Sequence, residues 1–220
     1  MMHNSVQNLL NIQKNIKSKF DFNQRIKIIA VSKTYSIKHI KPLIDHGHID
    51  FGENKVQEAI EKWSEVKNEN TLIKLHLIGK LQTNKVKKAV KIFDFIHSVD
   101  NERLAKKILD EQNNQGKKTK IFLQVNVGNE LQKSGVSIHQ LKNLYNYCKE
   151  LDLDVVGLMC IPPISEDNNR YFKEMSNLRK SLNLKELSMG MSSDFLQAMQ
   201  NQSTYLRIGT SIFGKRFYKI

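Results

Sequence analysis

Several residue types and patterns are scarce in this chain of 220 residues. Its two cysteines, Cys148 and Cys160, are too few for a disulfide framework or a four-thiolate metal site, so we predict free structural thiols in a reducing compartment. Three prolines and ten glycines leave no flexible linker. The most apolar run, at residues 26–31, is interrupted by Lys27, whereas a membrane helix needs about 20 apolar residues. These absences argue against a disulfide scaffold, a linked two-domain chain and a membrane-spanning protein.

Acidic residues are also few relative to basic ones. Lysine and arginine total 35 against 22 aspartates and glutamates, and the net charge of +13 attracts anions. Trp63 is the only tryptophan, and no basic strip is interleaved with stacking aromatics, as nucleic-acid binding would favour. Charge alone does not choose the partner: a phosphate-bearing small ligand would exploit the same positive field, and a nucleic-acid-associated protein is an alternative. The polar N-terminus lacks a signal-peptide pattern, and the charge opposes self-association, so we expect a cytoplasmic monomer.

Short β-branched runs alternate with segments of helical period along the chain. This alternation is typical of a parallel sheet with helices between its strands. Eight β/α units in about 195 residues, after an extra N-terminal helix at 6–19, favour one α/β domain over residues 1–220, a (β/α)8 TIM barrel. A doubly wound open sheet, the alternative, usually has about five to seven strands. The predicted strands are 26–32, 49–52, 72–79, 95–99, 121–127, 155–159, 187–189 and 206–209, and the predicted helices between them are 36–46, 54–66, 83–92, 101–112, 138–151, 168–182 and 194–201.

Residues at the ends of the predicted strands are the candidates for chemistry, because active sites of such barrels lie at the C-terminal ends of the strands. The first run ends in Ala-Val-Ser-Lys-Thr, which places Lys33 at the mouth of the barrel. An amine there is either a solvated surface group or a desolvated nucleophile with a lowered pKa, suited to Schiff-base formation.

The last run predicts a phosphate site beside this lysine. Alternation puts Arg207 and Gly209 on one face of the last strand, which neighbours the first strand in a closed barrel. Gly209 permits close approach of a ligand, and the loops after strands seven and eight commonly hold phosphate in this fold. Small polar residues after strand seven fit either an anion site or a simple helix cap by Ser193 or Asp194.

A lysine, an arginine and a phosphate cradle together describe a pyridoxal phosphate (PLP) pocket. Seven segments, in order and with matching spacing, resemble the pyridoxal phosphate homeostasis proteins over residues 5–217. The segments are AVSKT at 30–34, FGENKVQE at 51–58, HLIGKLQTNK at 76–85, KSG at 133–135, GLMCIP at 157–162, SMGMSSD at 188–194 and RIGTSIFG at 207–214. One departure is Tyr35-Ser36, where the family usually has lysine and proline.

The resemblance implies an alanine-racemase-like barrel, PLP fold type III, that binds PLP as a Schiff base on Lys33. The implied role is PLP (vitamin B6) homeostasis, with apo-enzymes as acceptors and without strong catalytic activity, so no catalytic residue is assigned. By resemblance, Arg207 faces the pyridine nitrogen, Ser192, Gly209 and Thr210 hold the phosphate, and Asn54, His76 and Ser188 line the pocket.

An active PLP-dependent racemase is the alternative function. A cationic arginine beside the pyridine nitrogen disfavours its protonation and weakens the ring as an electron sink, which argues against this alternative. The histidines show no metal-ligand spacing, so we predict no metal site. Most of them are predicted to lie on the surface or at the barrel mouth: His39, His46, His48, His76, His97 and His139.

Overall fold

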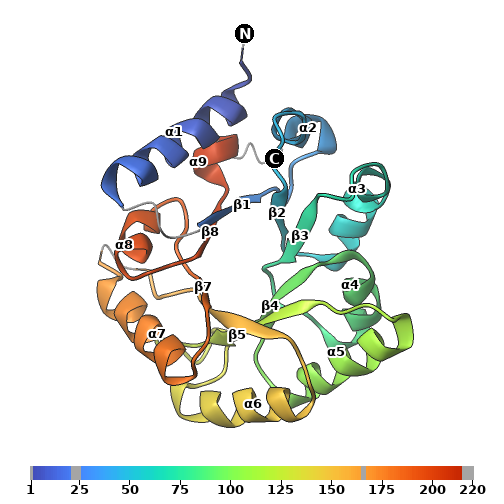
Figure 1. Cartoon of the computed structure of the whole chain (residues 1–220), viewed down its shortest axis with the longest axis vertical. Coiled ribbons are helices and arrows are strands. Elements are labelled where there is room, and N and C mark those ends of the chain that lie inside the picture. The colour runs from blue at the N-terminus through green and yellow to red at the C-terminus, as the bar shows by residue number, and fades with distance from the viewer. Residues whose placement is uncertain (1, 21–25, 165–166, 215–220) are drawn as a thin grey trace.

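The computed structural model describes residues 2–20, 26–164 and 167–214 of the chain. Eight parallel strands pair in chain order, and β8 pairs with β1, so the sheet closes into a barrel (Figure 1). This confirms the predicted (β/α)8 architecture. The strands are β1 Lys27–Val31, β2 Asp50–Glu53, β3 Lys74–Leu77, β4 Phe95–Val99, β5 Lys120–Val125, β6 Val155–Cys160, β7 Glu186–Ser188 and β8 Tyr205–Ile208.

Helices surround the barrel (Figure 1), and the longer ones bury apolar residues against it. α3 buries Trp63 in this way, and α5 ends at Gly116, whose φ of 62° suits a glycine. None of the helices in the described residues has the length and apolarity needed to cross a bilayer. The helices are α1 Asn4–Lys19, α2 Ile37–Asp45, α3 Val56–Glu69, η1 Thr83–Lys85, α4 Val86–Ile92, α5 Glu102–Gln115, α6 Ile138–Glu150, α7 Asn169–Ser181, α8 Phe195–Gln200 and α9 Thr210–Phe213.

Most predicted boundaries differ from the structure by one to three residues, and two of these differences lie near the candidate site residues. The helix predicted to begin at residue 54 begins at Val56, because Lys55 keeps an extended backbone at φ −122° and ψ 130°. The strand predicted at 187–189 is Glu186–Ser188, one residue earlier. Both shifts lie at the C-terminal end of a strand, where the chain leaves the sheet.

The extra N-terminal helix packs against the C-terminal end of the described chain. α1 lies beside α9 (Figure 1), and the Asn8 amide donates to the carbonyl of Ile212 at 3.0 Å. The Tyr35 hydroxyl donates to the carbonyl of Gly214 at 2.9 Å, and its ring stacks on Phe213. The loop after β1 is thereby tied to the segment after β8.

The barrel interior and the layer under the helices form separate apolar clusters. Strand residues alternate between the two, as the period of a strand requires. Cys148 and Cys160 belong to the outer layer, are free, and have pKa values raised to about 12 because they are buried. This confirms the prediction of free structural thiols. The interior cluster consists of Ile29, Phe95, Phe122, Met159 and Tyr205.

Candidate functional site

Lys33 lies in the turn that follows β1 and is half-buried. Ser32 continues the strand ladder by donating its N–H to the carbonyl of Gly52 at 2.9 Å, and its hydroxyl contacts residues on the outer side of the sheet. Lys33 therefore lies directly beyond the C-terminal end of β1, at the barrel mouth. Thr34 then adopts a left-handed conformation with φ 69°, which turns the chain away from the strand.

Helix α3 holds the backbone on both sides of Lys33. The Lys62 ammonium donates to the carbonyl of Ser32 and to the Glu58 carboxylate, each at 2.9 Å. The same Glu58 oxygen accepts from the N–H of Thr34 at 2.5 Å, and these contacts lower the pKa of Glu58 despite its partial burial. Because both neighbours are anchored, the position of Lys33 is set by the barrel rather than by a mobile loop.

A buried carboxylate lies at the centre of this support. Glu53 is fully buried, and its Oε1 atom accepts from Ser32 Oγ at 2.7 Å, from Lys62 Nζ at 3.0 Å and from Trp63 Nε1 at 3.0 Å. A carboxylate without such partners would be costly to bury. Glu53 is the last residue of β2, so the strand next to β1 carries this support itself. We refer to Ser32, Glu53, Glu58, Lys62 and Trp63 as the lysine-support cluster.

Arg207 lies on β8 inside the barrel, and only 4% of its surface is exposed. Its Nη1 donates to the Ser188 hydroxyl at 2.8 Å, and its Nη2 donates to the carbonyl of Cys160 at 2.8 Å. Burial lowers the pKa of Arg207, although a guanidinium stays charged in proteins. β7 and β8 thus bring together two predicted site residues, Ser188 and Arg207, through a direct hydrogen bond.

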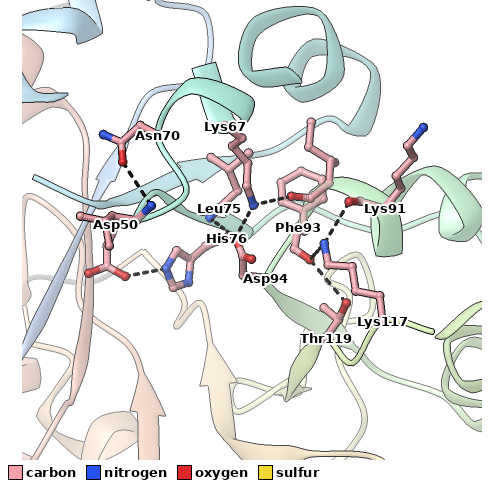
Figure 2. Close-up of polar contacts among 12 residues, drawn as sticks. Asp50, Lys67, Asn70, Leu75, His76, Lys91, Phe93, Asp94, Lys117 and Thr119 are labelled. Carbon is pink, nitrogen blue, oxygen red and sulfur yellow. Dashed lines mark hydrogen bonds and ion pairs between the residues drawn. The ribbon is translucent and has the colours of Figure 1, made fainter. Parts of the chain in front are cut away.

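Two histidines continue this polar contact through the barrel. His97 Nδ1 lies 2.9 Å from Ser188 Oγ, and His97 Nε2 lies 3.0 Å from His76 Nδ1. His76 Nε2 in turn lies 3.0 Å from Asp50 Oδ1, and Figure 2 shows this carboxylate directed at the His76 ring. Most of the histidines are predicted to lie on the surface or at the mouth, but His76 and His97 are exceptions, because both are fully buried in the barrel.

Beside Asp50 and His76, lysines brace the loop between α4 and β4 (Figure 2). Lys67 donates to Asp94 at 2.5 Å, while Lys117 donates to the carbonyls of Lys91 and Phe93 at 2.9 and 3.2 Å. Both lysines line a groove of about 500 Å³ between α3 and α4. Because their ammonium groups bond to the protein itself, we interpret them as structural supports.

The loops after β7 and β8 meet next to β1. The Ser192 hydroxyl accepts from the N–H of Ser211 at 3.2 Å, which joins the two loops. Gly209 is buried, and a Cβ atom there would lie 3.3 Å from Val31 Cβ, so its backbone lies close against β1. Thr210 follows it and is exposed. The structure therefore brings Ser192, Gly209 and Thr210 to one loop pair, beside the strand that leads to Lys33.

Asp194 occupies the N-cap position of α8, but its side chain does not cap the helix. Its Oδ1 accepts from the N–H of Met191 at 2.6 Å, and its Oδ2 accepts from the Asn168 amide at 2.9 Å. Its side chain makes no capping bond to α8, so the helix-cap interpretation of Asp194 is wrong. Instead, Asp194 closes the loop after β7 on itself and fixes the backbone around Ser192.

Asn54 lies in the loop after β2 and is half-buried. A Cβ atom on Gly79 would lie 2.3 Å from the Asn54 carbonyl oxygen, so the loops after β2 and β3 are in close contact there. Asn54 therefore belongs to this second loop pair, whereas Ser192, Gly209 and Thr210 belong to the first. The predicted residue His76 lies deeper in the barrel than these loops, between Asp50 and His97.

The buried histidines predict a pH dependence of stability. Burial lowers the pKa values of His48, His76 and His97 below the ordinary 6.5, so the unfolded chain binds protons that the folded protein does not. We expect the free energy of unfolding to be highest above pH 6.5 and to decline as the pH falls below it. Urea titrations at about pH 8 and pH 5.5 measure this, since carboxylates with lowered pKa values act only at more acidic pH. An equal or higher urea midpoint at the lower pH would contradict it.

Comparison with known proteins identifies relatives over nearly the whole chain. The family model for the alanine racemase N-terminal domain matches residues 7–216. The pyridoxal phosphate homeostasis protein of Pasteurella multocida is 34% identical over 227 residues, which cover 96% of this chain and 97% of that protein. These coverages of 96% and 97% exceed what a shared local motif would produce.

Solved structures agree with this relationship. PipY of Synechococcus elongatus, solved without PLP, has a TM-score of 0.88 and 32% identity, covering 96% of this chain and 100% of its own. The same protein with PLP bound has a TM-score of 0.83. Alanine racemase of Clostridium difficile shares the fold alone, at 16% identity and a TM-score of 0.73, and this chain covers 58% of it. This chain therefore belongs to the alanine racemase N-terminal domain family and, within it, to the pyridoxal phosphate homeostasis proteins.

Proposed function

We propose that this protein binds PLP through Lys33 and serves intracellular PLP homeostasis. The observation that carries the proposal is the pairing of β1 with β8, in which Ile29 lies opposite Arg207 and Ala30 opposite Ile208. This pairing sets the strand that leads to Lys33 beside the buried Arg207 cation and beside the loop pair of Ser192, Gly209 and Thr210. The name of the Pasteurella multocida relative and the PLP-bound PipY structure support the same ligand.

The donor set of this site fits the three functional groups of PLP. The Lys33 amine suits the aldehyde, the hydroxyls and backbone of the loop pair suit the phosphate, and the Arg207 guanidinium suits the ring nitrogen as a hydrogen-bond donor. Gly209 packs closely against Val31 and has no side chain, so it places no side chain in the space beside this loop pair. In the covalent step, the Lys33 amine adds to the aldehyde carbon and water leaves, so a C=N bond replaces the C=O bond.

We propose that the bound cofactor is stored and delivered rather than used for catalysis. PLP supplies an electron sink when its ring nitrogen is protonated, and a cation at that nitrogen opposes the protonation. Arg207 is such a cation. The relatives support this role, because their name describes homeostasis and no reaction. The acceptors proposed are PLP-dependent apo-enzymes, and the protein is proposed to act as a cytoplasmic monomer, since its charge of +13 opposes self-association.

An absorbance spectrum tests the binding proposal. We expect the purified protein, incubated with PLP and then desalted, to show an absorbance band at roughly 420 nm. Borohydride should abolish this band by reducing the C=N bond. Peptide mass spectrometry should then find the reduced pyridoxyl group on Lys33. A protein that stays colourless after incubation with PLP would overturn the proposal. Racemisation or transamination of amino acids at enzyme-like rates, about 1 to 1000 per second, would overturn the storage role and support the racemase alternative.

A further inference from the structure

We propose that Asp50, His76 and His97 are positioning residues for PLP. They form a hydrogen-bond chain that runs through the barrel interior and orients Arg207 toward the cofactor ring nitrogen. This inference rests on the proposed function and extends it to residues on β2, β3 and β4. The chain passes from Arg207 to Ser188, His97, His76 and Asp50, and each successive pair of polar atoms is separated by 2.8 to 3.0 Å.

Donor and acceptor counting assigns every proton in this chain. The Asp50 carboxylate accepts only, so His76 Nε2 carries a hydrogen and, in a neutral ring, His76 Nδ1 is an acceptor. His97 Nε2 must then donate to His76 Nδ1, which leaves His97 Nδ1 to accept from the Ser188 hydroxyl. Ser188 Oγ in turn accepts from Arg207 Nη1. All bonds point the same way, from the arginine to the carboxylate.

Both histidines are neutral in this arrangement, and their surroundings support that state. His76 stacks on Phe95 with ring centroids 4.4 Å apart, and His97 stacks on Phe122 at 4.1 Å. Burial lowers the pKa values of both rings, and Arg207 further lowers that of His97. A proton added to His76 Nδ1 would place two donors face to face at its contact with His97, and a proton added to His97 Nδ1 would do the same at its contact with the Ser188 hydroxyl.

The chain matters for Arg207 because this cation is buried and bonded to neutral groups. Its two hydrogen-bond acceptors are the Ser188 hydroxyl and the Cys160 carbonyl. Asp194 adds a more distant negative charge, and Asp50 acts through the aligned dipoles of the chain. Aligned hydrogen bonds polarise one another, so the Ser188 oxygen becomes a stronger acceptor for Arg207. The guanidinium is thereby held in one orientation.

Nuclear magnetic resonance of the histidine nitrogens tests the chain itself. At neutral pH, ¹⁵N–¹H correlation spectra of the protein without PLP should show His76 and His97 as neutral rings protonated at Nε2. A protonated ring, or the Nδ1–H tautomer for either residue, would overturn the inference. This readout does not depend on cofactor binding, so it remains decisive if the proposed function fails.

PLP titration of variants tests the positioning role. His97→Leu removes one acceptor and one donor, and we expect PLP affinity to fall about tenfold, the effect of one orphaned buried polar contact. His97→Gln keeps an acceptor and a donor on one planar group and should recover most of the affinity. His139→Leu is the control, because His139 is an exposed residue of α6 and lies outside the hydrogen-bond chain.

A variant at a second position keeps the positioning role testable if the His97 variants fail to fold. Asp50→Ala, near the end of the barrel where the carboxylate is partly exposed, should fold and lower PLP affinity about threefold by removing the negative end of the chain. Wild-type affinity in both Asp50→Ala and His97→Leu would overturn the positioning role. A wild-type protein that itself fails to bind PLP would overturn the proposed function instead.

Discussion

Lys33→Ala is expected to abolish covalent retention of PLP completely. The variant still has Arg207 and the loop pair of Ser192, Gly209 and Thr210, so it should bind PLP noncovalently and lose it on desalting. No amine remains at the mouth to form the C=N bond, and borohydride should therefore fix no pyridoxyl group there. Absorbance after desalting and intact-protein mass measure the two effects.

The matched control is Lys80→Ala, which removes an exposed lysine from the loop after β3. Its spectrum and its mass after reduction should equal those of the wild type. PLP reacts with accessible amines in general, so this control separates the site from surface modification. Retention of a reducible band in Lys33→Ala, at wild-type amplitude, would show that another lysine forms the bond.

Lys62→Met is expected to lower the free energy of unfolding by about 3 to 5 kcal/mol. The substitution keeps the apolar stem but leaves the fully buried Glu53 carboxylate without its cation. It also removes the donor to the Ser32 carbonyl and the partner of Glu58, so the turn around Lys33 loses its anchor. Urea unfolding followed by circular dichroism measures the stability.

The control for this prediction is Lys41→Met. Lys41 forms an ion pair with Asp45 at 2.9 Å, the same length as the pair between Lys62 and Glu58, but the side chains of Lys41 and Asp45 are both more than half exposed. Exposed pairs of this kind contribute about 0.3 to 0.5 kcal/mol. A loss below about 1 kcal/mol in Lys62→Met would mean that Glu53 is neutral or solvated after the substitution.

The double variant Glu53→Gln with Lys62→Met should be more stable than Lys62→Met alone, because no buried charge is left uncompensated.

Sequence patterns predict the barrel well because its strands and helices repeat with clear periods. The strand at 95–99 has the predicted bounds, and all eight strands occur in the predicted order. The predicted boundaries of helices and strands are wrong where the conformation of single residues, rather than the periodic pattern, sets the end of an element. Lys55 stays extended although it continues a helical pattern, so α3 begins two residues later than predicted.

The interior polar chain could not be predicted, although its members occupy alternating strand positions. Alternation tells which face of the sheet a residue occupies, but its depth in the barrel depends on the register between neighbouring strands. His97 illustrates the difference, because it lies at the level of Ser188 and His76 only once β3, β4 and β7 are closed into one sheet. Depth also decides burial, so a histidine predicted to lie at the surface is fully buried.

The lysine-support cluster was missed for another reason. Glu53 and Lys62 appear in the sequence as ordinary charges on a strand end and a helix, and charged residues are usually exposed. Their spacing of nine residues corresponds to no helical or strand period. Trp63 next to Lys62 is the one available signal, because a buried indole N–H needs an acceptor and the nearest acidic residue on a strand is Glu53.

The pairing of β1 with β8 also has a consequence for synthesis on the ribosome. Lys33 is translated early, whereas Arg207 and Gly209 follow about 10 to 35 s later at ordinary elongation rates. Until then the nascent chain has the amine but neither the guanidinium nor the second of the two loops proposed to bind phosphate. Because the last strand closes the barrel beside β1, the proposed PLP site can form only after β8 has been translated. Truncated products that lack β8 would carry a reactive amine without this pocket.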